Sequence, residues 1–125
     1  MDKKEMVGNI RSVLTRFINE KCKVNMAMLI KDINADTYTF LISSEFLNLF
    51  TPYEATKFIA EYFYSELDRD IFRFISRINV IHTNDPSISV IYKAMNIKGS
   101  TVEITNCNLF GVQIDNAILF ESHRD

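Results

Sequence analysis

Four side chains in the second half of the chain could together hold a metal ion. His82 and Asp85 flank a predicted turn, and Glu121 and His123 would share one face of a strand. Imidazole and carboxylate groups are common ligands of zinc and related ions. Their spacing matches no diagnostic ligand motif, so we expect no metal site and no other cofactor.

Cys107 could act as a nucleophile if His82 or His123 served as its base. However, a single cysteine in an apolar strand usually packs as a small hydrophobic residue. The sequence also has no Gly-rich phosphate loop, no serine nucleophile elbow and no dinucleotide fingerprint. We therefore expect a protein without catalysis. An enzyme would need both histidines and an acidic residue in one pocket.

Three arginines, Arg69, Arg73 and Arg77, recur every fourth residue. In an unbroken helix they would form a basic ridge able to bind phosphates or carboxylates, and a strand would still align the last two. Two interpretations are open. The ridge binds an anionic small molecule or nucleotide, or it is a solvated face with Asp68 and Asp70 as neighbours.

The composition predicts one domain, because 125 residues with 47% hydrophobic and 12% aromatic residues suffice for a single core. A net charge of -2 is too balanced for general attraction to phosphates, so we do not expect nucleic-acid binding. Cys22 and Cys107 lack the clustering of a disulfide framework, and we expect both to be reduced. No membrane span and no signal-peptide core are recognised, so we expect a cytoplasmic protein without a membrane partner.

Apolar periodicity predicts the elements of the first half of the chain. Spacings of three and four residues indicate a helix over 3–22, and a hairpin follows over 24–33 and 37–43. Residues 45–50 are expected to form one short helical turn. Thr51-Pro52-Tyr53-Glu54 is a capping box with proline at the first helical position, so a second helix begins there, and no Gly or Pro marks its end before residue 76.

The second half of the chain is expected to consist of strands. The helical period gives way to a strand near Ser76, a turn follows over 83–86, and alternating apolar residues predict a strand over 88–94. Residues 100–122 continue as strands. The predicted fold class is α+β, with two main helices on one face of an antiparallel sheet. The order is α-β-β-(short α)-α-β-β-β-β.

Residues 102–121 also divide into four groups of five, each with Ile or Leu at its centre. This pattern resembles the pentapeptide-repeat family, which implies one coil of a square, right-handed helix of short strands. A coil of that kind needs neighbours above and below it. A meander explains much of the same segment, with Val102, Ile104, Phe110, Val112 and Ile114 inward and a hairpin at 115–116. We favour the meander.

The second predicted helix has more apolar surface than one sheet can cover. Its apolar side chains spread over an arc of about 240°, whereas a helix on a sheet needs a stripe only somewhat over 100° wide. The first helix and the short helical turn could cover the excess. Alternatively, the excess is a partner-binding patch formed by five residues: Phe46, Phe50, Ala60, Tyr64 and Leu67.

We therefore expect a small, non-catalytic protein-interaction module that is homodimeric or binds another protein, through this patch or an open sheet edge. Adaptor, chaperone-like, toxin-neutralising and regulatory roles all fit this expectation. The alternative is a sensor domain that binds an anionic small molecule or nucleotide through Arg69, Arg73 and Arg77.

Overall fold

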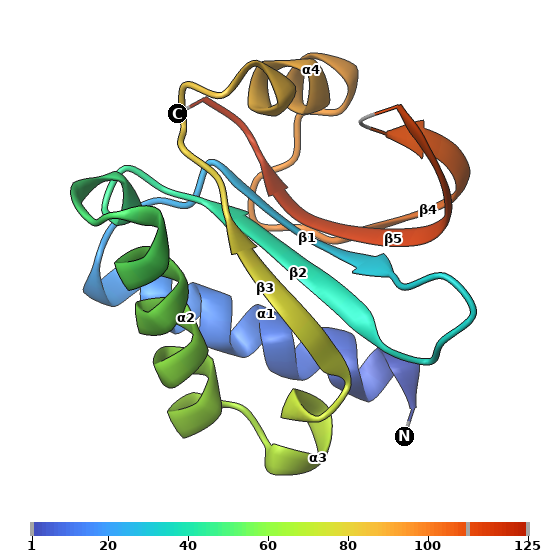
Figure 1. Ribbon diagram of the computed structural model, residues 1–125, viewed down its shortest axis with the longest axis horizontal. Coiled ribbons are helices and arrows are strands. Elements are labelled where there is room, and N and C mark those ends of the chain that lie inside the picture. The colour runs from blue at the N-terminus through green and yellow to red at the C-terminus, as the bar shows by residue number, and fades with distance from the viewer. Residues whose placement is uncertain (1, 110, 125) are drawn as a thin grey trace.

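The computed structural model describes residues 2–109 and 111–124, and its centre is a five-stranded sheet (Figure 1). Strands β1 (Met26–Lys31), β2 (Tyr38–Ser43), β3 (Ile75–Val80), β4 (Val102–Leu109) and β5 (Val112–Ser122) lie in the order β3-β2-β1-β5-β4. Every neighbouring pair is antiparallel except β2 and β3, which are parallel. The predicted α+β class is confirmed, with a mixed sheet in place of a purely antiparallel one.

Helices α1 (Lys3–Glu20) and α2 (Pro52–Glu66) cover one face of the sheet, with the short elements η1 (Leu47–Leu49) and α3 (Arg69–Phe72) beside them (Figure 1). Their apolar sides enclose a core that includes Phe17, Phe40, Phe63 and Phe120, all fully buried. The predicted capping box is confirmed, since the Thr51 and Glu54 side chains each receive a hydrogen bond from the other's backbone N–H. No helix in the described ranges is long and apolar enough to cross a membrane.

Helix α4 (Pro86–Ala94) corrects the sequence prediction, which expected a strand over 88–94. Asp85 caps this helix by accepting from the Ser87 N–H, and Pro86 occupies the first turn. These are the same start signals as in α2, and they outweigh the apolar alternation. Helix α4 lies on the opposite face of the sheet from α1 and α2, where Ile88 and Ile91 join a second core (Figure 1). The sheet is therefore covered on both faces.

Strands β4 and β5 form an antiparallel hairpin, which confirms the meander over the pentapeptide-like coil. The predicted reversal at 115–116 is wrong, because the register continues through Asn116 and ends at the pair Leu109 and Val112. Gly111 has a φ of 75°, a left-handed value that glycine adopts readily. Ile114 is buried as expected, but Val112 is 49% exposed. Phe110 lies outside the described residues.

Asp32 joins three strands at the end of the sheet near the β1–β2 turn. Its carboxylate accepts hydrogen bonds from Thr37 (2.5 Å), Thr39 (2.8 Å) and Ser76. Burial raises the pKa of Asp32, but these three donors and the charge of Arg77 together hold it below its ordinary value. Because Ser76 belongs to β3, this carboxylate fixes the parallel edge strand to the hairpin.

The lowered pKa of Asp32 predicts that its contribution to the free energy of unfolding is lost at acidic pH. The ionised group stabilises the fold above its unfolded pKa of about 4, and the contribution is lost as the pH falls through the lower folded value. Asp32→Ala should reduce the free energy of unfolding by about 1 kcal/mol at pH 7 and by much less at pH 2. Urea unfolding at both pH values measures this. Asp36→Ala, an exposed position in the same turn, is the control, and an equal loss for Asp32→Ala at both pH values contradicts the prediction.

Candidate functional site

Four rings form a continuous aromatic row along η1 and α2: Phe46, Phe50, Phe58 and Tyr62. Phe58 stacks on Phe50 at 5.7 Å and on Tyr62 at 6.2 Å between ring centroids. All four side chains are half-buried, so each presents part of its ring to solvent. Two of the predicted patch residues, Phe46 and Phe50, therefore lie together in this row.

Helix α1 supports one side of the aromatic row. The buried Phe17 ring meets Phe46 and Tyr62 edge to face. The Tyr62 hydroxyl donates to Glu20 at 2.9 Å. Burial, followed by this hydrogen bond and nearby negative charge, raises the pKa of Tyr62 to about 12. The Lys21 ammonium lies 5.4 Å from the Phe46 ring centre and 5.7 Å from that of Phe58.

The other three predicted patch residues do not join the row. Tyr64 is six residues after Phe58, which turns it about 240° around the helix. Its ring packs on Phe72 and beneath the Arg69 guanidinium. Ala60 is half-buried and Leu67 is buried, at 5% exposure. The five predicted residues therefore do not form one patch: Phe46 and Phe50 lie in the row, Tyr64 packs on α3 and Leu67 is buried.

The three arginines do not form one ridge, because α2 ends at Glu66, the short helix α3 ends at Phe72 and a strand begins at Ile75. Arg69 stacks on Tyr64, and Arg73 lies 3.6 Å from the Asp70 carboxylate. Arg77 belongs to β3, where its charge acts on Asp32. Each arginine therefore has a different neighbour.

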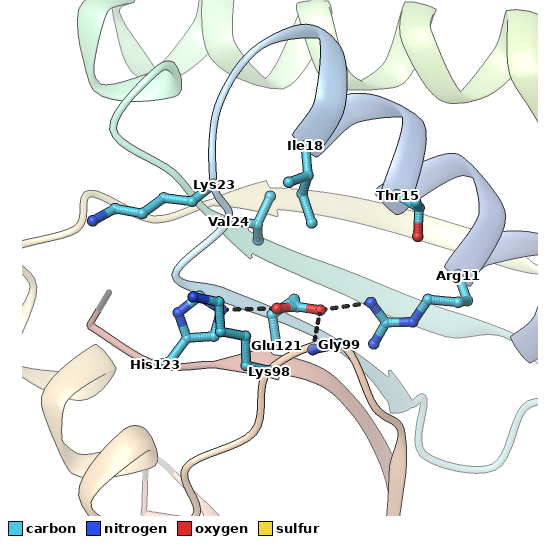
Figure 2. A pocket seen from close by; sticks show the side chains of 9 residues that line it. All are labelled: Arg11, Thr15, Ile18, Lys23, Val24, Lys98, Gly99, Glu121 and His123. Atoms are coloured by element: carbon cyan, nitrogen blue, oxygen red, sulfur yellow. Dashed lines mark hydrogen bonds and ion pairs between the residues drawn. The ribbon is translucent and has the colours of Figure 1, made fainter.

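A pocket of about 220 Å³, here called the α1 pocket, lies between α1 and the end of β5 (Figure 2). Helix α1 contributes Arg11, Thr15 and Ile18. The segment before β1 adds Lys23 and Val24, the loop after α4 adds Lys98 and Gly99, and the end of β5 with the residue after it adds Glu121 and His123. Segments that are far apart in the sequence thus meet around one cavity.

Glu121 is the centre of a buried polar network in this pocket and is 2% exposed. One carboxylate oxygen accepts from Arg11 at 2.5 Å and from the Gly99 N–H at 3.1 Å, and the other faces the His123 Nε2 at 2.8 Å (Figure 2). Arg11 also donates to the carbonyls of Phe120 and Ser100. The network fixes α1 and the loop after α4 against β5.

The remaining candidates for chemistry are divided between two places. Glu121 and His123 meet, as expected from their shared strand face. His82 is exposed and belongs to the turn before α4, where Asp85 is the helix cap. Within residues 2–109 and 111–124, no group of three or more His, Cys, Asp or Glu side chains could hold a metal ion.

Sequence reasoning missed Arg11 as the partner of Glu121, because 110 residues separate them. One signal was present in the sequence. Glu121 directly follows the apolar run Ala117-Ile118-Leu119-Phe120. A carboxylate that such a run draws into the protein interior requires a buried partner. Comparison with known proteins gives no match to any family, any curated protein or any solved structure.

The Arg11–Glu121 pair predicts a large, coupled effect on stability. Arg11→Met should lower the free energy of unfolding by about 3 kcal/mol, because it leaves a buried carboxylate without its cation. The double variant Arg11→Met/Glu121→Met should cost clearly less than the sum of the two single changes. Arg16 lies on the same helix as Arg11 and forms a more exposed pair with Glu66 of α2. Arg16→Met should therefore lower the free energy of unfolding by less than about 1 kcal/mol. Additive losses in urea unfolding would contradict this coupling.

Proposed function

We propose that this chain is a non-catalytic protein-interaction module that acts as a homodimer through the aromatic row. The observation that carries the proposal is the row itself, four half-buried rings in unbroken contact at the surface of the core. Aromatic residues are enriched in protein interfaces, where they supply large contact areas with little loss of side-chain freedom.

Charges of opposite sign flank the aromatic row, and this favours a second copy as the partner. Lys21 lies on the α1 side. Glu61, three residues after Phe58, and Glu54, four residues before it, lie on the opposite flank of α2, where Glu61 also lies 4.0 Å from the Lys57 ammonium. A two-fold axis that runs along the row places each Lys21 opposite the partner's flank that carries Glu54 and Glu61. Such a surface is complementary to itself, as an isologous dimer requires.

The other surfaces give weaker support. Strand β3 is a sheet edge with β2 as its neighbour, but its exposed positions are Ser76, Arg77 and Asn79. Polar and charged residues on an edge strand oppose pairing with another chain. The alternative of a sensor that uses the three arginines is also less supported, because Arg69 and Arg73 already contact Tyr64 and Asp70.

Phe58→Asp should convert the dimer into a monomer, because a carboxylate at the centre of the row would be desolvated in the interface. Light scattering at about 100 µM protein measures the change, and far-ultraviolet circular dichroism confirms that the variant is folded. Val90→Asp is the matched control, since Val90 is 65% exposed on α4, across the sheet from the row. A monomeric native protein, or a dimeric Phe58→Asp variant, would contradict the proposal.

Charge reversal tests the same interface without touching its rings. Lys21→Glu and Glu61→Lys should each weaken the dimer by placing like charges opposite each other, and the double variant should restore it. Both side chains are exposed, so the fold should be unaffected. Sedimentation equilibrium gives the dissociation constants. Failure of the double variant to recover would rule out the two-fold arrangement described here.

A further inference from the structure

The α1 pocket is a second candidate site, separate from the aromatic row. None of its nine lining residues belongs to the row. Its walls come from four segments, and the Glu121 network fixes three of them to one another. A preformed cavity with walls from several elements is the usual form of a small-molecule site.

The charges around the pocket favour an anion. Arg11 neutralises Glu121, and both carboxylate oxygens already have hydrogen-bond partners (Figure 2). Two lysines remain, Lys23 and Lys98. Among the described residues, neither forms an ion pair with a carboxylate, and the Lys23 ammonium donates to the neutral carbonyl of Arg124. The Lys23 side chain extends away from the cavity, so Lys98 is the lining cation left to pair with an anion (Figure 2).

The uncharged part of the wall favours an apolar body on the same ligand. The Ile18 and Val24 side chains lie close together above the Glu121 network, and Thr15 lies on the same helix beside them (Figure 2). A volume of about 220 Å³ limits the ligand to a compact molecule.

The buried imidazole of His123 is the third observation. Its Nε2 faces Glu121, but its Nδ1 is buried and has no hydrogen-bond partner among the described residues. The His123 side chain is 5% exposed. An unpaired buried nitrogen is costly, and a polar group that enters the pocket and bonds to it would remove that cost.

We propose that the α1 pocket binds a small monocarboxylate with an apolar body. The carboxylate pairs with Lys98, and the alkyl or aryl part packs on Ile18 and Val24. A single negative charge matches the wall better than a phosphate does, because Arg11 is already paired with Glu121 and the Lys23 ammonium with a carbonyl, which leaves Lys98 beside an apolar wall.

Nuclear magnetic resonance titration with hexanoate tests the proposal, with hexanol, hexylamine and inorganic phosphate as matched probes. Hexanoate should give saturable shifts at the amides of Ile18, Val24 and Gly99. Hexanol and hexylamine should bind at least fivefold more weakly, since they lack the negative charge. Absence of saturable shifts, or equal shifts with hexylamine or phosphate, would overturn the proposal.

Three variants assign the binding to this pocket. Lys98→Met should weaken hexanoate binding about fivefold, and Thr15→Leu, at an exposed position of α1, should weaken it by occupying the pocket. Lys57→Met, on the exposed strip of α2, should leave it unchanged. Phe58→Asp should also bind hexanoate normally, so this result is independent of the dimer. Unchanged binding in both Lys98→Met and Thr15→Leu would refute the assignment.

Discussion

The rest of the structure depends on the neutralisation of one buried carboxylate. Glu121 lies at the end of β5, a strand covered on both faces near its C-terminal end, and it is 2% exposed. An unpaired charge at that depth would be far more costly than the marginal stability of a small domain allows. Arg11 provides the opposite charge. Its two further hydrogen bonds, to the Phe120 and Ser100 carbonyls, fix the position of α1 on the sheet. The orientation of α1 then places Phe17 beneath the aromatic row.

The sequence predicted elements whose signals are local. Helix α1, the β1–β2 hairpin, η1 and the start of α2 follow from apolar spacing and from the capping box. Helix α4 was missed although Asp85-Pro86 provides the same kind of start signal as Thr51-Pro52. Ile88, Val90 and Tyr92 alternate as in a strand, whereas the buried pair Ile88 and Ile91 has helical spacing. Nine residues are too few for periodicity alone to choose between them.

The candidate site was predictable only where neighbours in space are neighbours in sequence. The apolar circumference of α2 correctly indicated that more than the sheet must contact it. The helix spacing alone already separates Phe58 from Tyr64, yet only the position of α3 decides that Tyr64 packs on Phe72. The arginine ridge required the second helix to continue to residue 77, but α2 ends at Glu66 and the separate helix α3 ends at Phe72. The α1 pocket depends on pairings across 89 to 110 residues, which a single sequence does not contain.

Helix α1 connects the two proposed sites, because one side of the helix contacts the aromatic row and the other lines the α1 pocket. Phe17, Glu20 and the adjoining Lys21 contact the aromatic row. Arg11, Thr15 and Ile18 line the α1 pocket. A substitution that displaces α1 would alter both surfaces at once. If Arg11→Met changed dimerisation, that result would therefore not locate the partner. Phe58 and Lys98 lie outside α1 and on different elements. Variants at these two positions therefore separate a surface that holds a second copy from a cavity that holds a small anion.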